Sequence, residues 1–216
     1  MCVLVWGAPG LAGATAESPS ELAVALQLKY DRIKDFATDF VHIYRGGVLN
    51  KTLTERGRLL VKKPGKMRWE YAAPERKLFV SDGVKLYSYL PDDKQVLVTS
   101  VPSDDEATTP ALFLAGKGNL TRDFASSFVE LPADLPEGAL GLKLVPKSPQ
   151  PDYDWLILAV DPRTLDLKGL VTVDAQGGTS SFSFRNLKEN IGLADKAFDF
   201  TVPRGVDLIT DASTRR

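Results

Sequence analysis

From Asp35 almost to its end, the chain consists of short runs rich in β-branched and aromatic residues, with turn residues between them. In the stretch VKKPGKMRWEYAAP, Met67, Trp69 and Tyr71 alternate with charged residues, so a strand here has one apolar face and one charged face. Because no helices alternate with these runs, the pattern argues against a parallel architecture. It favours a large curved sheet, a barrel or a sandwich.

These runs predict about eleven or twelve strands, paired mostly in antiparallel fashion. Asp82-Gly83 suits a two-residue hairpin, because both central residues of a type I′ turn need positive φ. The expected strands are Phe36–Tyr44, Thr52–Lys62, Lys66–Tyr71, Arg76–Ser81, Lys85–Leu90, Gln95–Ser100, Asp123–Leu131, Leu140–Pro146, Trp155–Asp161, Leu167–Asp174, Ser180–Leu187 and Phe198–Val202.

A helix is predicted ahead of the strands. Ser18 is a good N-cap, Pro19 stands at the first helical position, and Glu21 is placed to reach back to the cap as in a capping box. The helix should extend to about Lys34 and pack through one apolar stripe. That stripe consists of Leu22, Leu26, Tyr30 and Ile33.

A second helix is predicted in ATTPALFLAGKGN. Thr108 or Thr109 serves as the cap, Pro110 begins the helix and Gly116 ends it. Because the helix is apolar nearly all round, it must be buried on most sides. Two interpretations stay open on periodicity alone: a plug within the core, or a lid over the sheet.

The first sixteen residues carry no charge, and Ala14-Thr15-Ala16 fits a signal-peptide cleavage site. We expect residues 1–16 to be a signal peptide, with its positive segment missing and the true start further upstream, and residues 17–216 to form one domain. Two alternatives are a disordered N-terminus and acylation of Cys2. Cleavage after Ala16 leaves a chain without cysteine, and hence without disulfides.

Charge and motifs indicate a binding protein rather than an enzyme. With 27 basic and 28 acidic residues, no net field attracts nucleic acid. His42 is the single histidine, without a nucleophile motif or metal-ligand partners, so we interpret it as a surface or packed residue. No phosphate-binding glycine motif occurs. We expect no enzymatic activity, no metal and no cofactor, and an apolar ligand.

Three stretches of the sequence resemble a known family. GRLLVKKPGKMRWEYAAPERKLFVSDGVKLYSYLPDDKQV, TTPALFLAGKG and AFDFTVPRGVDLI are similar to LolA, the periplasmic carrier of outer-membrane lipoproteins. The resemblance implies an unclosed antiparallel β half-barrel of about 11 strands, with helices covering its concave face as a lid. It also implies a monomer in the periplasm that takes acylated lipoproteins from an inner-membrane ATP-binding-cassette transporter to an outer-membrane lipoprotein acceptor.

The resemblance also implies which residues bind lipid. The lid is expected to be fastened by Lys63, where the family usually has an arginine; lysine has three donors but lacks the planar fork of arginine. Residues expected on the acyl-chain cavity are Leu26, Tyr30, Met67, Trp69, Phe79, Leu112 and Leu114.

Two other functions remain open within this fold. One is a related half-barrel that binds another lipid or senses mislocalised lipoproteins. The other is a membrane-anchored lipoprotein acceptor, which needs an acylated N-terminal cysteine. An esterase that uses His42 is a third, enzymatic alternative.

Overall fold

The computed structural model describes residues 18–46, 51–101, 114–116, 118–148, 153–173 and 177–210. Within these residues, one 12-stranded sheet forms, in the order β12-β6-β5-β4-β3-β2-β1-β11-β10-β9-β8-β7. Its strands are β1 (Asp35–Arg45), β2 (Thr52–Lys62), β3 (Lys66–Ala73), β4 (Lys77–Asp82), β5 (Lys85–Leu90), β6 (Gln95–Ser100), β7 (Phe124–Val129), β8 (Leu140–Pro146), β9 (Trp155–Val160), β10 (Leu167–Val173), β11 (Thr179–Glu189) and β12 (Asp207–Thr210).

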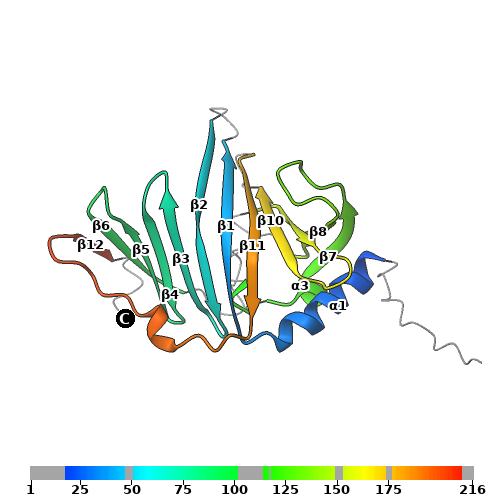
Figure 1. Ribbon diagram of the computed structural model, residues 1–216, viewed down its shortest axis with the longest axis horizontal. Coiled ribbons are helices and arrows are strands. Elements are labelled where there is room, and N and C mark those ends of the chain that lie inside the picture. Colours follow the sequence, from blue (N-terminus) through cyan, green and yellow to red (C-terminus); the bar gives the residue numbers. More distant parts are fainter. Residues whose placement is uncertain are drawn as a thin grey trace, which may run out of the picture.

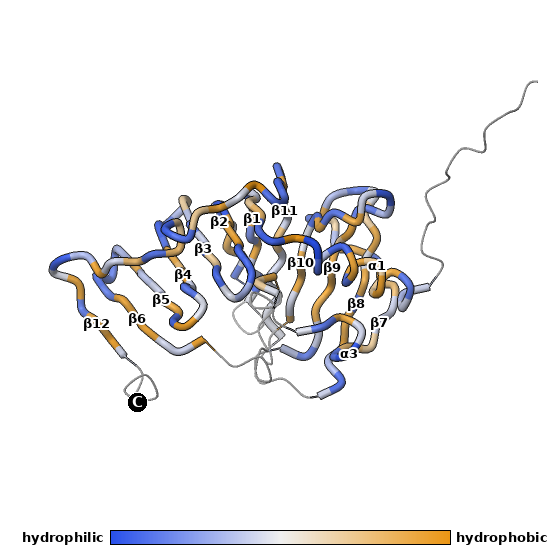
Figure 2. The backbone as a smooth tube through the Cα atoms, turned by 90° about the horizontal axis from the view of Figure 1, so that it is seen from below, coloured by the Kyte–Doolittle hydropathy of each residue, from blue (hydrophilic) through white to orange (hydrophobic). Residues whose placement is uncertain are grey.

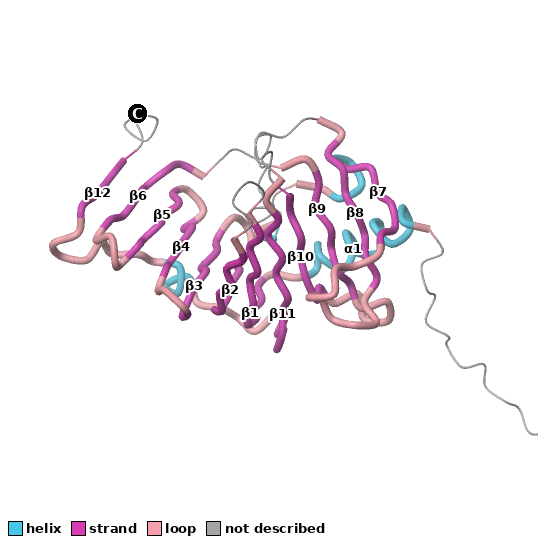
Figure 3. The backbone as a smooth tube through the Cα atoms, turned by 90° about the horizontal axis from the view of Figure 1, so that it is seen from above, coloured by secondary structure: helices cyan, strands magenta, loops and turns pink. Residues whose placement is uncertain are grey.

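The sheet curves into an arc that does not close on itself (Figures 1 and 3). Strands β12 and β7 lie at its two ends and do not pair with each other. All neighbours are antiparallel except β12, which runs parallel to β6. The expected unclosed, mostly antiparallel half-barrel is confirmed.

Helix α1 (Pro19–Arg32) covers one arm of the arc. Its start matches the sequence prediction: the Ser18 hydroxyl accepts from the Glu21 amide at 3.2 Å, and the Glu21 carboxylate accepts from the Ser18 amide at 3.1 Å. Leu22 and Leu26 are buried against the sheet, whereas Leu28 on the opposite face is 56% exposed. The helix packs on α3 (Leu120–Asp123), β7 and β8.

The second predicted helix falls mostly outside the described residues. Of that segment, Leu114, Ala115, Gly116, Gly118 and Asn119 are described. Leu114 and Ala115 have no exposed surface.

The predicted strand Phe198–Val202 is wrong. Its first residue closes the 3₁₀ helix η1 (Asp195–Phe198), and the following residues form no strand. Phe198 is buried, and the Phe200 ring lies 5.3 Å from the ring of Tyr87. The alternating phenylalanines therefore pack on the outer face of the sheet, where no neighbouring strand is available to pair with them.

The hairpin between β4 and β5 forms, but one residue later than predicted. Asp82 ends β4, and Gly83 and Val84 make the turn, with Gly83 at φ +100°. The Asp82 carboxylate accepts from the amides of Val84 and Lys85 at 2.8 and 2.7 Å. Asp82 therefore stabilises the turn through its side chain instead of occupying a left-handed position.

Buried apolar side chains form two clusters, one on each face of the sheet. The larger one fills the concave side between the sheet and α1 and includes Phe40, Leu59, Trp69, Leu142 and Leu158. A smaller one, around Ile157 and Val171, lies on the other face of β9 and β10. In Figure 2 the apolar segments concentrate along the strands, and the connecting turns are mostly hydrophilic.

Candidate functional site

A narrow apolar cavity lies beneath α1. Its volume is about 30 Å³, which is enough for about one water molecule. Leu26 and Tyr30 of the helix, and Ile33 at its C-cap, face Phe36 of β1 and Leu158 of β9 across it. The remaining lining residues are Lys29, Thr38, Leu120, Leu165, Leu167, Phe184, Leu187 and Glu189. A space of this size does not hold a ligand of several carbon atoms.

Lys63, in the turn between β2 and β3, contacts the end of α1. Its ammonium donates to the Tyr30 carbonyl oxygen and lies 3.5 Å from the centre of the Tyr30 ring. Burial lowers the pKa of the Lys63 ammonium to about 8, against the opposing effect of Asp31. The hydrogen bond and the cation–π contact join the sheet to the helix at one residue.

The segment Leu114–Gly116 meets the same point. The Tyr30 hydroxyl donates to the Leu114 carbonyl oxygen, and the Gly65 amide donates to the Ala115 carbonyl oxygen at 3.0 Å. Burial, together with Glu189, raises the pKa of Tyr30, so its hydroxyl remains a donor. Tyr30 thus links α1, the β2–β3 turn and this segment.

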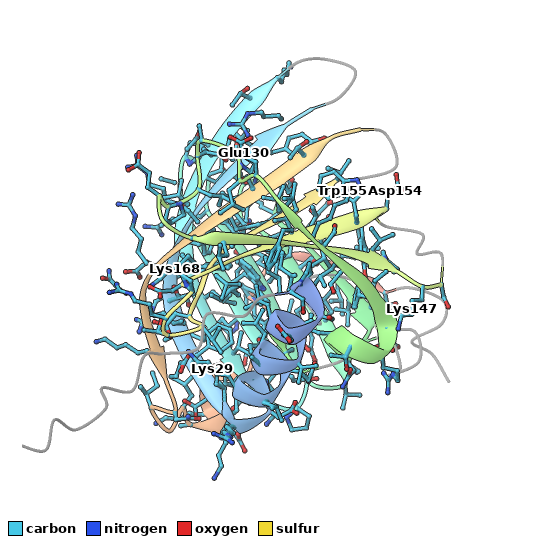
Figure 4. The ribbon with its side chains drawn as sticks, turned by 90° about the vertical axis from the view of Figure 1, so that its right-hand side faces the viewer. Lys29, Glu130, Lys147, Asp154, Trp155 and Lys168 are labelled. Atoms are coloured by element: carbon cyan, nitrogen blue, oxygen red, sulfur yellow. The ribbon has the colours of Figure 1, made fainter. Side chains whose placement is uncertain are left out.

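Lys29 fastens the other side of α1, a contact that sequence reasoning missed. Its ammonium lies 2.5 Å from Asp166 Oδ1 and 3.2 Å from Glu189 Oε1, and donates to the Thr164 carbonyl oxygen at 3.1 Å. Figure 4 labels Lys29 on α1. Since these partners lie far along the chain, only the assembled sheet brings them to the helix. The position of Lys29 in the last turn of the predicted helix was the one feature of the sequence that pointed to a role in fastening the helix.

The structure brings most of the predicted cavity residues into one apolar cluster, but it places only two on the cavity wall. Leu26 and Tyr30 line the cavity. Met67, Trp69 and Leu114 are buried in the same cluster, and Phe79 packs at its border. Leu112 lies outside the described residues. Their roles in lipid binding remain predictions.

The apolar concave wall continues beyond α1. Phe79, Ser88, Leu97 and Ile209 are register partners across β4, β5, β6 and β12, so they share one face of the sheet. Leu97 is 41% exposed and Ile209 is 46% exposed. This arm of the concave face therefore offers apolar surface that is not fully covered.

A buried polar group interrupts the concave wall at the far end of β1 and β2. His42 Nδ1 lies 3.2 Å from Glu55 Oε2, and Lys77 Nζ lies 2.7 Å from Glu55 Oε1. The His42 ring stacks on Phe182 at 4.1 Å, so the interpretation of His42 as a packed histidine is confirmed. Sequence reasoning missed Glu55, although it is in period-two phase with the buried Leu59.

Neither a membrane-spanning helix nor a metal-binding group is evident in the described part of the chain. None of the described helices is long and apolar enough to cross a bilayer. No cluster of three or more His, Cys, Asp or Glu side chains there could hold a metal ion.

Fold and site together define an unclosed antiparallel β half-barrel with an apolar concave face under a helix. The family model described as outer membrane lipoprotein carrier protein LolA matches residues 31–201. The chain belongs to the LolA family.

Individual relatives agree over nearly the full length. A protein from Chromohalobacter salexigens, named outer-membrane lipoprotein carrier protein, is 32% identical over 199 residues, which cover 91% of this chain and 90% of that protein. A protein of the same name from Methylococcus capsulatus is 29% identical and covers 97% of this chain and 94% of its own.

Among solved structures, an uncharacterized conserved protein from Thermus thermophilus matches with a TM-score of 0.53 at 12% identity. The match covers 88% of this chain and 97% of that chain. At this identity the likeness shows the fold alone.

Proposed function

We propose that this protein carries outer-membrane lipoproteins by binding their acyl chains between α1 and the concave face of the sheet. The observation that supports the proposal most strongly is a wall of apolar side chains under a helix that only a few polar contacts fasten. The names of the relatives in its family are consistent with this function.

The narrow cavity explains how such a carrier releases its cargo. Burying acyl chain contributes about 0.8 kcal/mol per CH₂, so complete burial of several chains in a ready-made pocket would make release too slow. Here the cavity holds about 30 Å³, so cargo must first displace α1. The free energy of closing the helix on the sheet is subtracted from that of binding, which keeps the cargo transferable.

We extend the proposal to the route of the cargo. The protein acts in the periplasm, after removal of residues 1–16, receiving lipoproteins from an inner-membrane ATP-binding-cassette transporter and passing them to an outer-membrane acceptor. In this proposal the transporter supplies the energy for loading.

The test is retention of a purified triacylated lipoprotein in solution after its detergent is diluted away. Leu26→Glu places a carboxylate against the cavity, because Leu26 is 7% exposed. Leu28→Glu is the matched control, since Leu28 lies in the same helix and is 56% exposed. We expect Leu26→Glu to lower the soluble lipoprotein at least about ten-fold and Leu28→Glu to leave it unchanged. Equal retention by both variants would refute the cavity.

A further inference from the structure

The concave face changes from apolar to polar along the strands. On β1, Phe36 lines the cavity and Phe40 packs in the aromatic cluster, whereas His42 follows at the next inward position. On β2, Leu59 is apolar and Glu55, on the same face, is a buried carboxylate. Since alternate residues of a strand share a face, the wall is apolar at one end and polar at the other.

The same change occurs on the next two strands. Trp69 pairs with Phe79, and two positions along the face Tyr71 pairs with Lys77. Lys77 Nζ reaches Glu55 Oε1 at 2.7 Å, which closes the polar end across β2, β3 and β4. An amphiphile with an apolar chain and a polar head has the same division.

Within the polar end, one atom is left without a partner. His42 Nε2 is completely buried and makes no hydrogen bond. Buried polar atoms are nearly always paired, and an unpaired one destabilises the protein that contains it. A ligand reaches this atom only when the side chains that cover it move aside, and pairing with the atom then removes that cost.

The partners of Nδ1, the other ring nitrogen, determine whether Nε2 donates or accepts a hydrogen bond. The Glu55 carboxylate, 3.2 Å from Nδ1, accepts hydrogen bonds, so Nδ1 carries the proton. The Tyr71 hydroxyl at 3.5 Å from the same nitrogen is the weaker contact. In the neutral ring Nε2 is then an acceptor. Burial lowers the pKa of His42, against the effect of Glu55 and together with that of Lys77, which favours the neutral ring.

We propose that His42 Nε2 accepts a hydrogen bond from the amide N–H at the junction of acyl chain and peptide in the cargo. The inference rests on the proposed carrier function. Ester and thioether groups of a lipidated N-terminus offer no donor, whereas the N-acyl amide does. The apolar chain then lies along Phe40 and Phe36 toward the cavity, with the amide at the polar end.

Two probes that differ in one N–H test the hydrogen bond. N-methylpalmitamide has the amide proton, and N,N-dimethylpalmitamide lacks it. We expect the wild-type protein to bind the first about three- to ten-fold more tightly, the range for one net hydrogen bond. His42→Phe, whose ring can still stack on Phe182, should bind both equally. Phe182→Leu is the matched control and should weaken both probes while keeping their ratio.

A direct measurement does not depend on the folding of a variant. Because the sequence has one histidine, long-range ¹H–¹⁵N spectra of a protein without a histidine tag report His42 alone. The free protein should show a protonated Nδ1 and an unprotonated Nε2. N-methylpalmitamide should shift the Nε2 resonance, and the dimethyl probe should leave it nearly unchanged.

The outcomes separate this inference from the proposed function. If both probes bind the wild-type protein equally and the Nε2 resonance does not respond, the hydrogen bond is refuted while the apolar cavity stands. If the His42→Phe variant still binds N-methylpalmitamide more tightly than the dimethyl probe, another group accepts the amide hydrogen bond and the inference is wrong. If neither probe binds and lipoprotein is not retained, the carrier function itself is refuted.

Discussion

Lys63 binds Tyr30 in two ways at once: its ammonium donates to the Tyr30 carbonyl oxygen and lies 3.5 Å from the centre of the Tyr30 ring. This pair joins the β2–β3 turn to the end of α1. An ammonium is a point donor, whereas the planar guanidinium fork of an arginine can hold several carbonyls at once. Within the contacts described for Lys63, one carbonyl and one ring hold it to the end of α1.

Lys63→Met should tighten the binding of apolar ligands. The variant keeps an apolar stem but loses both contacts to Tyr30, so the closed position of α1 competes less with the ligand. We expect about three- to ten-fold tighter binding of N-phenylnaphthylamine, a neutral fluorescent probe, in titrations near pH 7. Lys62→Met is the matched control, because Lys62 bonds the Leu193 carbonyl and Asp195 instead. If both substitutions changed the affinity for the probe to a similar extent, the contacts of Lys63 would not be what holds α1 closed.

Because the pKa of Lys63 is lowered in the folded protein, the free energy of unfolding should rise at alkaline pH. Its folded-state pKa of about 8 lies below the ordinary value of 10.5, so above pH 8 the unfolded chain binds more protons than the native one. The free energy of unfolding should therefore increase from about pH 8 to about pH 10. Urea denaturation at several pH values measures it, and Lys63→Met should lack this rise.

Above about pH 10 the trend should reverse. Burial raises the pKa of Tyr30 and of Tyr71 in the folded protein, so the native state keeps protons that the unfolded chain loses. A continued increase of stability beyond this pH in the wild-type protein would contradict the burial of the two hydroxyls.

Lys29→Gln should loosen α1. The substitution removes the ammonium that lies between Asp166 and Glu189 beside the cavity, and we expect a loss of about 1 kcal/mol in the free energy of unfolding. Amide hydrogen exchange of α1 should increase. Lys168→Gln is the control: its ammonium is 3.7 Å or more from its acidic partners, and the change should stay within about 0.5 kcal/mol. The effect of Lys29 should also shrink in high salt.

Gly57→Ala should be strongly destabilising, although it adds one methyl group. A Cβ at this position lies 2.1 Å from the Glu70 carbonyl oxygen and 2.6 Å from Cζ of Phe40, whose ring packs over the glycine. We expect a loss of about 3 kcal/mol by thermal or urea denaturation. At Gly46 the nearest atom to an added Cβ is 3.5 Å away, so Gly46→Ala should change stability by less than about 0.5 kcal/mol. A small loss at Gly57 would contradict the packing of Phe40.

Strand prediction succeeded where one face of the sheet is buried and the other is charged. In β3 the alternation of Met67 and Trp69 with charged residues fixed both the strand and its inward face. It failed at the C-terminus, where Phe198 packs on the outer face without a strand. β12 was missed because Leu208 and Ile209, both exposed, leave no alternation to read.

The candidate site was less predictable, because its polar contacts join distant parts of the chain. Lys29 and Asp166 are 137 positions apart, and the contact between them depends on the full sheet order. His42 and Glu55 become cross-strand partners only once the register of β1 and β2 is known. The two-residue alternation along each strand places His42 and Glu55 on the apolar face, but it does not show that they lie opposite each other.

Strands β6 and β7 lie on opposite arms of the sheet, with β12 alone beyond β6. The chain between these strands links the two arms of the arc, and its residues Ala115 and Gly116 are held against Gly65 and the stem of Lys63. Lys63 thus touches both this segment and Tyr30 of α1, so a displacement of either one changes the packing of the same side chain.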